Sequence, residues 1–123
     1  SNMRQIRTLS LALGFLALVA IPASGQDVTG TWVLSVDLGA AGGGDATFVF
    51  AQEGVEITGT YTGQTGDGVE VTGTVEDGVI KFSFISDLAG AVSYEGAIEE
   101  GVFKGTCIYG DLGEGIFEGK KSS

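Results

Sequence analysis

Apolar and polar residues alternate along the chain from Thr29 to its C-terminal end. In residues 31–37, Trp32, Leu34 and Val36 lie on one face of an extended chain, because successive side chains of a strand point to opposite sides. Later segments are also rich in β-branched and aromatic residues, and glycines interrupt them at short intervals. No helical period persists after the N-terminal segment, so the pattern predicts an all-β domain.

Pairs of an acidic residue and a glycine recur between these segments and predict three tight hairpin turns: Glu53-Gly54, Asp77-Gly78 and Glu100-Gly101. Such pairs suit the positive φ angles of a two-residue hairpin loop. A two-residue loop also fixes every cross-strand pair. The predicted register therefore pairs apolar residues across each hairpin: Phe50 with Ile57, Val75 with Ile80, and Ile98 with Phe103.

Together with a first strand around Trp32 and a last strand over residues 115–120, the hairpins give eight short strands. Eight strands are enough to close an antiparallel up-and-down β-barrel. The other four connections, residues 38–45, 63–68, 86–90 and 110–113, are longer and should meet at one end of the barrel. The prediction is a barrel with a tight-turn floor at one end and a mouth fringed by loops at the other.

The register turns one set of side chains toward the barrel interior, and this set includes every aromatic residue after the N-terminal segment: Trp32, Leu34, Val36, Phe48, Phe50, Val55, Ile57, Tyr61, Val69, Val71, Ile80, Phe82, Phe84, Val92, Tyr94, Ile98, Phe103, Cys107, Tyr109 and Phe117. The plainest interpretation is a packed core. However, all three tyrosines fall in the mouth half, and a buried phenol needs a hydrogen-bond partner.

These tyrosines indicate an amphipathic pocket, for which we expect the following ligand-binding residues: Tyr61, Tyr94, Tyr109, Phe84, Val36 and Val92. The floor of the barrel is predicted to consist of Gly30, Trp32, Phe50 and Phe103. The glycine-rich connection of residues 38–45 lacks the lysine and the following helix of a phosphate-binding loop, which favours a lid or a plain linker.

The N-terminal segment predicts export. Residues 1–2 precede Met3 and are interpreted as an expression scar, and residues 3–25 have the basic start, apolar run and small-residue end of a helical signal peptide. The apolar run is short for a membrane span, which needs about 20 residues, although an uncleaved anchor is the alternative. The barrel domain would then cover residues 26–123 and be periplasmic or extracellular, with no membrane contact after processing.

Charge and missing residue types narrow the candidate functions. The formal net charge is −10 at pH 7, and an acidic surface repels phosphate backbones, so nucleic acid is not expected as a partner. The chain has no histidine, the commonest general base and transition-metal ligand, and its single cysteine, Cys107, has no disulfide partner. No cofactor or metal is expected; calcium between acidic mouth loops is a minor alternative, since no spacing matches a known site.

Gly30-x-Trp32 at the start of the first strand resembles the Gly-x-Trp signature of calycin barrels, the lipocalins, fatty-acid-binding proteins and avidins. The pairing of this motif with Thr58-Gly59-Thr60-Tyr61 looks especially like an avidin, and the chain is also similar to small exported bacterial barrels. The resemblance implies that Trp32 plugs the closed end under a basic side chain, Lys120 or Lys121, and that Tyr61 matches a binding position. Avidin biotin sites use several tryptophans, whereas this chain has one.

Three functions remain open. The leading one is an exported barrel that binds a small hydrophobic or amphipathic molecule inside its mouth. The second is a barrel-type cyclase or isomerase that moves a proton with a tyrosine or a carboxylate, which would need an acidic residue inside the barrel. The third is a non-catalytic structural or interaction module with a packed core. Oligomers are possible in each case, and the volume of any cavity separates the three.

Overall fold

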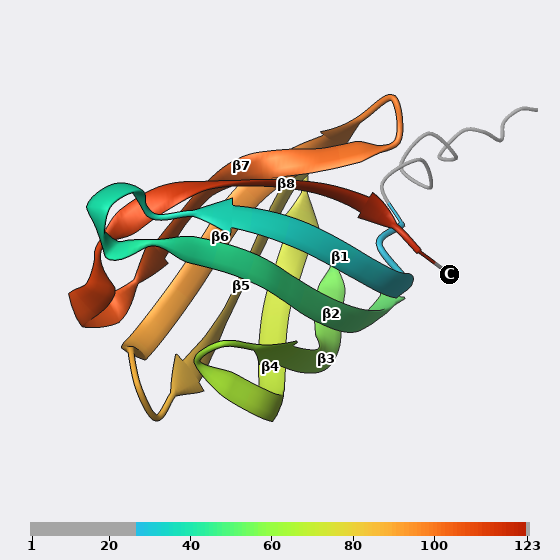
Figure 1. The fold of residues 1–123 in the computed structure, drawn as a ribbon. Helices are drawn as coiled ribbons and strands as arrows, with labels where there is room; N and C mark the ends of the chain where they lie inside the picture. Colours follow the sequence, from blue (N-terminus) through green and yellow to red (C-terminus); the bar gives the residue numbers. More distant parts are fainter. Residues whose placement is uncertain (1–26, 123) are drawn as a thin grey trace, which may run out of the picture.

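The computed structural model describes residues 27–122, which form a closed antiparallel β-barrel (Figure 1). Each strand pairs with the next in sequence, and the last pairs with the first, so the predicted eight-stranded up-and-down order is confirmed. The strands are β1 (Gly30–Asp37), β2 (Gly43–Glu53), β3 (Glu56–Gly63), β4 (Gly66–Glu76), β5 (Val79–Ser86), β6 (Gly90–Glu99), β7 (Val102–Tyr109) and β8 (Glu114–Lys121). The expected scar and signal peptide lie outside the described residues.

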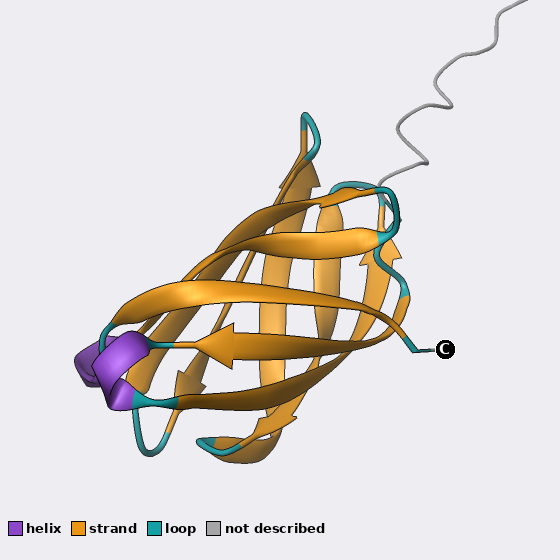
Figure 2. Ribbon diagram, turned by 45° about the horizontal axis from the view of Figure 1, so that its top comes forward, coloured by secondary structure: helices purple, strands orange, loops and turns teal. Residues whose placement is uncertain are grey.

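The two ends of the barrel differ, as Figure 2 shows. One end, called here the tight-turn end, carries the β2–β3, β4–β5 and β6–β7 turns. The other, called the mouth, carries the remaining connections and two short 3-10 helices, η3 (Gly39–Ala41) and η4 (Gly110–Leu112). Within the described part of the chain, no helix has the length and apolar character needed to cross a membrane.

Two of the three predicted hairpin registers are confirmed. Val75 lies opposite Ile80 and Ile98 lies opposite Phe103. At these turns the acidic residue and the glycine both have positive φ, 53° at Asp77 and 81° at Gly78 in the first case. This is the backbone that a type I′ turn requires, and its twist matches that of the flanking strands.

The predicted register of the first hairpin is wrong by one step. Glu53 stays in the ladder opposite Glu56, and the turn consists of Gly54 and Val55, with positive φ at Gly54 only. A hairpin turn with glycine at its first central position needs no second residue with positive φ. Val55, predicted to face inward, therefore sits in the turn with 52% of its surface exposed.

This shift changes which residues lie opposite each other, but each side chain stays on the predicted face of the sheet. The side chains predicted to point inward on β2 and β3 therefore still do so. Phe50 lies opposite Gly59 rather than Ile57, and Phe48 lies opposite Tyr61. Apart from Val55, the predicted inward residues are buried or, at Val69 and Ile98, partly buried.

Three of the four mouth connections are shorter than predicted, and the fourth, residues 110–113, has the predicted bounds. Strand β3 runs to Gly63 and β4 begins at Gly66, so only Gln64 and Thr65 separate them, where residues 63–68 were expected to form a loop. The register shifts between Tyr61 and Gly63, which shows a β-bulge at this point. Gly63 and Gly66, on the two sides of this turn, still pair with each other, so the β3–β4 ladder continues up to the turn.

Interlocking aromatic rings fill the barrel interior. The Phe48 ring lies 4.9 Å from Phe82 and 5.2 Å from Tyr94, in edge-to-face arrangements that rings prefer. The Phe82 and Tyr94 rings are stacked at 4.8 Å. Gly73 makes room for this packing, because a Cβ atom there would lie 2.6 Å from the Cβ atom of Phe82. The middle of the barrel is a solid core.

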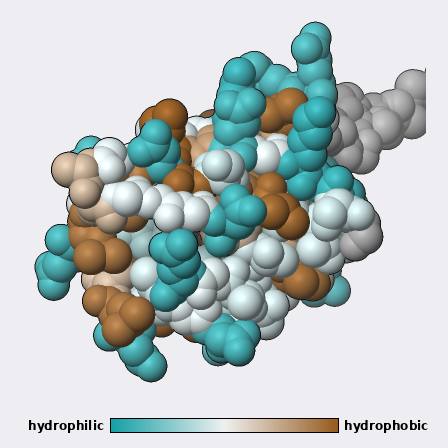
Figure 3. Space-filling model, in the orientation of Figure 1, coloured by the Kyte–Doolittle hydropathy of each residue, from teal (hydrophilic) through white to brown (hydrophobic). Residues whose placement is uncertain are grey.

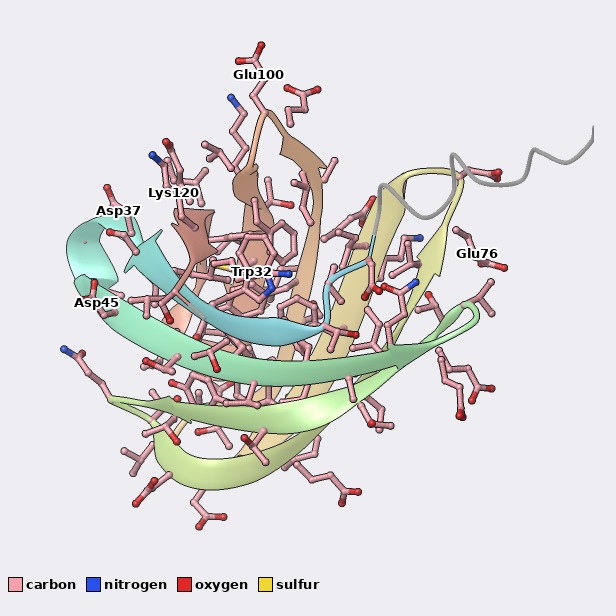
Figure 4. All side chains as sticks on the ribbon, turned by 90° about the vertical axis from the view of Figure 1, so that its right-hand side faces the viewer. Trp32, Asp37, Asp45, Glu76, Glu100 and Lys120 are labelled. Atoms are coloured by element: carbon pink, nitrogen blue, oxygen red, sulfur yellow. The ribbon has the colours of Figure 1, made fainter. Side chains whose placement is uncertain are left out.

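Trp32 seals the tight-turn end, where Figure 4 shows it at the centre of the barrel. Its ring is 2% exposed and packs edge-on against Phe103 at 5.6 Å. The indole N–H donates to the backbone oxygen of Val28, 2.9 Å away, and Val28 itself is fully buried. The Nζ atom of Lys121 lies 5.8 Å from the ring centroid, within the range of a cation–π contact.

The predicted floor residues thus lie near one another, but two residues that the sequence pattern did not single out complete the floor. The Gln52 side chain accepts a hydrogen bond from the backbone N–H of Val28, at 2.9 Å, and fixes the segment that crosses the barrel end. Val28 precedes the first strand, so strand alternation gives no signal for its burial.

Candidate functional site

A small cavity of about 60 Å³ opens at the mouth. Three of the six predicted ligand-binding residues line it, namely Val36, Tyr61 and Tyr109. The other three, Phe84, Val92 and Tyr94, are buried outside its lining. Its remaining walls come from the mouth loops and the adjoining strand ends: Leu38, Ala41, Gly43, Gly44, Asp45, Ala46, Gln64, Thr65 and Leu112. This mouth pocket is the candidate site.

The β3–β4 turn positions Tyr61 at the pocket. A Cβ atom at Gly63 would lie 2.5 Å from the Tyr61 hydroxyl oxygen, so glycine allows the phenol to lie against the backbone of its own hairpin. The Tyr61 hydroxyl and Thr65 Oγ1 are hydrogen-bonded at 2.9 Å. The Tyr61 ring also stacks on Phe84 at 4.2 Å, so Phe84 supports the pocket wall from below.

Tyr109 and Tyr94 form a buried pair of phenols beside this wall. Their hydroxyl groups are hydrogen-bonded to each other, and the two side chains are 3% and 2% exposed. Burial is the main cause that raises the pKa of both phenols above the ordinary value, because an apolar surrounding disfavours the charged form. The Tyr94–Tyr109 pair is therefore neutral at physiological pH, and Tyr109 brings this pair to the pocket wall.

Hydrogen bonds join three of the four mouth connections into one rim. Ser86 Oγ donates to the Thr65 backbone oxygen at 2.7 Å and links the β5–β6 turn to the β3–β4 turn. Ser86 Oγ also accepts hydrogen bonds from the backbone N–H groups of Leu88 and Ala89. The Asp111 N–H in turn donates to the Ala89 oxygen at 3.2 Å, which ties η4 to this rim.

The β1–β2 loop stands apart from this rim. The hydrogen bonds of residues 38–42 stay within the loop: Leu38 N–H donates to the Gly42 oxygen, and the Asp37 carboxylate accepts from the N–H of Gly39. Gly39 and Gly42 both have positive φ. Across the pocket, the Gln64 side chain occupies the space that a Cβ atom would fill at Gly44. This loop is the wall of the pocket least tied to its neighbours.

A larger hollow of about 630 Å³ lies on the outside of strands β3–β7. Its outward side chains are hydroxyls such as Thr58 and Thr72, the charged Glu56, Lys81 and Glu95, and the apolar Ile108, and it is open to solvent. The space-filling view shows apolar atoms scattered between hydrophilic ones on the outer surface (Figure 3). The mouth pocket, in contrast, reaches the buried side chains of Tyr61 and Tyr109 at the end of the barrel, so a ligand there would be enclosed on more sides, and we favour it over this hollow.

The interior offers no carboxylate for acid–base chemistry. Apart from the tyrosines, Trp32 and Cys107, the buried side chains of the described residues that carry a polar group are Thr65 and Ser86. Burial raises the pKa of the Cys107 thiol to about 11, so the thiolate needed for nucleophilic attack is scarce at neutral pH. In residues 27–122, no group of acidic or cysteine side chains is arranged to hold a metal ion.

Comparison with known proteins adds no family to this description. No family model matches the chain, and a search of curated protein sequences finds no match. The barrel and its mouth pocket are therefore the features that bear on function.

The sequence pattern did not predict several of the residues that line the mouth pocket. Leu38, Ala41 and Leu112 lie in connections, where alternation carries no information about which side chains turn inward. Ala46 lies on the inward face of β2, but its small side chain gives only a weak hydrophobic signal in the sequence. In the sequence, Thr65 and Ser86 are polar residues of predicted loops. Only the tertiary structure shows that both are buried.

Proposed function

We propose that this protein is a small-molecule-binding barrel of the calycin type, which takes the end of a small amphipathic molecule into its mouth pocket. The single observation that supports the proposal best is the pocket itself, in which two phenols stand among the apolar side chains of Val36, Leu38 and Leu112. An apolar wall with a few polar groups that fix orientation is typical of ligand sites. The lysine over Trp32 agrees with the calycin resemblance.

The pocket volume sets the size of the ligand. A single water needs about 10–15 Å³ of such space, so about 60 Å³ takes roughly four or five atoms of similar size. Pockets that enclose a whole drug-sized ligand measure about 300–1,000 Å³. We therefore propose that only one end of the ligand is buried, and that the rest lies along the rim and the β1–β2 loop.

Binding is favoured over catalysis by the composition of the interior. A cyclase or isomerase of the kind considered above would need a carboxylate or another group that exchanges a proton near neutral pH. The buried phenols hold their protons more strongly than usual, and the carboxylates of the described residues lie outside the core. The packed-core module is the competing function, and a binding experiment separates the two.

Two neighbouring alanines of η3 allow a matched test. Ala41 lines the pocket and Ala40 does not, although both are exposed. Short alcohols and small phenols are screened by native mass spectrometry, and hits are located by amide chemical shifts at Val36, Leu38 and Tyr109. We expect Ala41→Phe to weaken binding at least about tenfold, because the added ring would occupy the small pocket and overpack its walls, and Ala40→Phe to leave binding unchanged. If no compound shifts these amides, the packed module replaces the binding function. If both variants bind normally, the ligand does not bind in the mouth pocket and the proposed site is wrong.

A further inference from the structure

Exposed apolar side chains form a row on the outer face of strands β5, β6 and β7, close to the mouth. Ile85 of β5 is 69% exposed, and Ala91 lies opposite it on β6. On β7, Ile108 is 47% exposed and lies opposite Ser93, one strand position further from the mouth. Ile85, Ala91 and Ile108, called here the apolar row, line a second outer hollow of about 780 Å³. Contiguous exposed apolar residues mark an interaction surface more often than scattered ones do.

Charged side chains flank the apolar row in the same order on β5 and β7. On β5, Lys81 lies four residues from the isoleucine toward the tight-turn end, and Asp87 lies two residues from it toward the mouth. On β7, Lys104 and Asp111 lie four and three residues from the isoleucine in the same two directions. All four charged residues are exposed. This face therefore has a basic edge, an apolar middle and an acidic edge.

The same face repels a second acidic chain less than the opposite wall of the barrel does. The formal net charge of the chain is −10 at pH 7, so two copies repel each other overall. Strands β2, β3 and β4 contain no lysine or arginine, whereas β5 and β7 each contain a lysine. A nucleic acid or an anionic lipid surface would be repelled as well.

We infer that this face is the interface of a symmetric dimer of the chain. A two-fold axis along the apolar row, across the strands, sets each strand against its own counterpart in the opposite direction. The isoleucines of the two copies then meet, Lys81 of one copy approaches Asp87 of the other, and Lys104 likewise approaches Asp111. A two-fold axis along the strands would instead set lysine against lysine, so the charge order selects the first arrangement.

The apolar row supplies the contact, and the charges set its orientation. Glu95 and Glu118 lie opposite Lys81 and Lys104 within the sheet, so each lysine also has an acidic neighbour in its own chain. Exposed ion pairs contribute little to affinity. Three strands of a curved barrel also form a narrower face than the ~800 Å² per partner of a standard interface. We therefore expect a weak dimer, with a dissociation constant of about 10–100 µM.

Sedimentation equilibrium of the full chain from about 10 µM to about 1 mM tests the dimer. Ile108→Glu places two carboxylates at the proposed axis and should weaken the dimer at least about tenfold. Val49→Glu is the matched control, because Val49 is 48% exposed on β2, four strands from β6 in the closed barrel (Figure 1). It should change the dissociation constant by less than about twofold. Circular dichroism checks the fold, and Ile85→Glu replaces Ile108→Glu if that variant unfolds.

A charge reversal tests the orientation. Lys81→Glu should weaken the dimer about three- to tenfold, because the change is repeated across the two-fold axis, and adding Asp87→Lys should restore it. Lys81→Glu with Glu53→Lys on β2 restores the net charge alone and should leave the dimer weak.

Three results would overturn the inference. A monomer at every concentration would exclude the dimer, and equal effects of Ile108→Glu and Val49→Glu would exclude this face. Failure of Asp87→Lys to restore the dimer, or equal recovery with Glu53→Lys, would exclude the antiparallel arrangement. Ligand binding at the mouth pocket does not depend on any of these results.

Discussion

The same eight strands form both ends of this barrel, but different interactions hold the two ends together. At the tight-turn end, Trp32, Phe103 and Val28 pack into a dry floor, and the indole N–H has a backbone acceptor. At the mouth, the phenols of Tyr61 and Tyr109 line a small pocket whose rim is held by hydrogen bonds rather than by apolar contacts. The floor is thus held by buried ring packing and the mouth by hydrogen bonds around a small pocket, so substitutions at the two ends should differ in the size and kind of their effect.

Truncation of the floor should have the largest effect. We expect Trp32→Ala to lower the free energy of unfolding by about 3–5 kcal/mol, because it removes a large buried ring and leaves a cavity. Urea unfolding followed by circular dichroism measures the change. Exposed Val33→Ala, one residue along β1, is the control and should change stability by at most about 0.5 kcal/mol. A loss below about 1 kcal/mol for Trp32→Ala would mean that the floor depends on other residues.

Alkaline pH should weaken the core next. The Cys107 pKa is raised from 9.0 to about 11, and the pKa values of Tyr94 and Tyr109 are raised above 10.0. The unfolded chain thus releases these protons at a lower pH than the folded chain. Stability is fully present below pH 9 and falls as pH rises beyond it, by at most about 1.4 kcal/mol per pH unit for each group. Cys107→Ala should remove the decline that begins near pH 9, which urea titrations at stepped pH will show.

At the mouth, we expect Ser86→Ala to cost about 1–3 kcal/mol, because the Thr65 oxygen and two backbone N–H groups lose their partner in a buried place. Ser83→Ala on the outer face of the same strand is the matched control and should be nearly neutral. Thermal unfolding compares the two. Equal, small effects would show that the rim does not hold the mouth together.

Tyr94→Phe should have a smaller effect on stability, about 0.5–1.5 kcal/mol, because it removes one hydrogen bond and keeps the ring. Tyr94 does not line the pocket, so ligand binding should change only through the freed hydroxyl of Tyr109. Calorimetric titration with the hits from the alcohol screen measures binding in both Tyr94→Phe and Tyr109→Phe. A larger binding loss in the first variant would contradict the assigned lining.

The smallest free energies should belong to the β1–β2 loop. Its hydrogen bonds are internal, whereas the other mouth connections are bonded to one another. Amide hydrogen exchange by mass spectrometry should therefore show faster exchange in residues 38–42 than in residues 86–89, since local opening depends on few contacts there. Equal protection of the two segments would mean that the loop is held as firmly as the rim.

The sequence alone predicts the order of the strands and the closure of the barrel. It also predicts which side chains point inward and most of the register. These features follow because the side-chain period of two and the acidic-glycine turns leave one arrangement in which the apolar residues meet. At Gly54 the same reasoning was wrong by one step, because two turn types fit a Gln-Glu-Gly-Val segment and only the folded backbone selects between them.

Tertiary structure alone decided the site. The sequence placed three tyrosines at the mouth end, but pocket size depends on how Phe48, Phe82 and Phe84 interlock below them, which no strand pattern contains. The walls supplied by Leu38, Ala41 and Leu112 depend on loop conformations set by contacts distant in sequence. Strand periodicity is a local property, whereas a cavity is what remains after the whole core has packed.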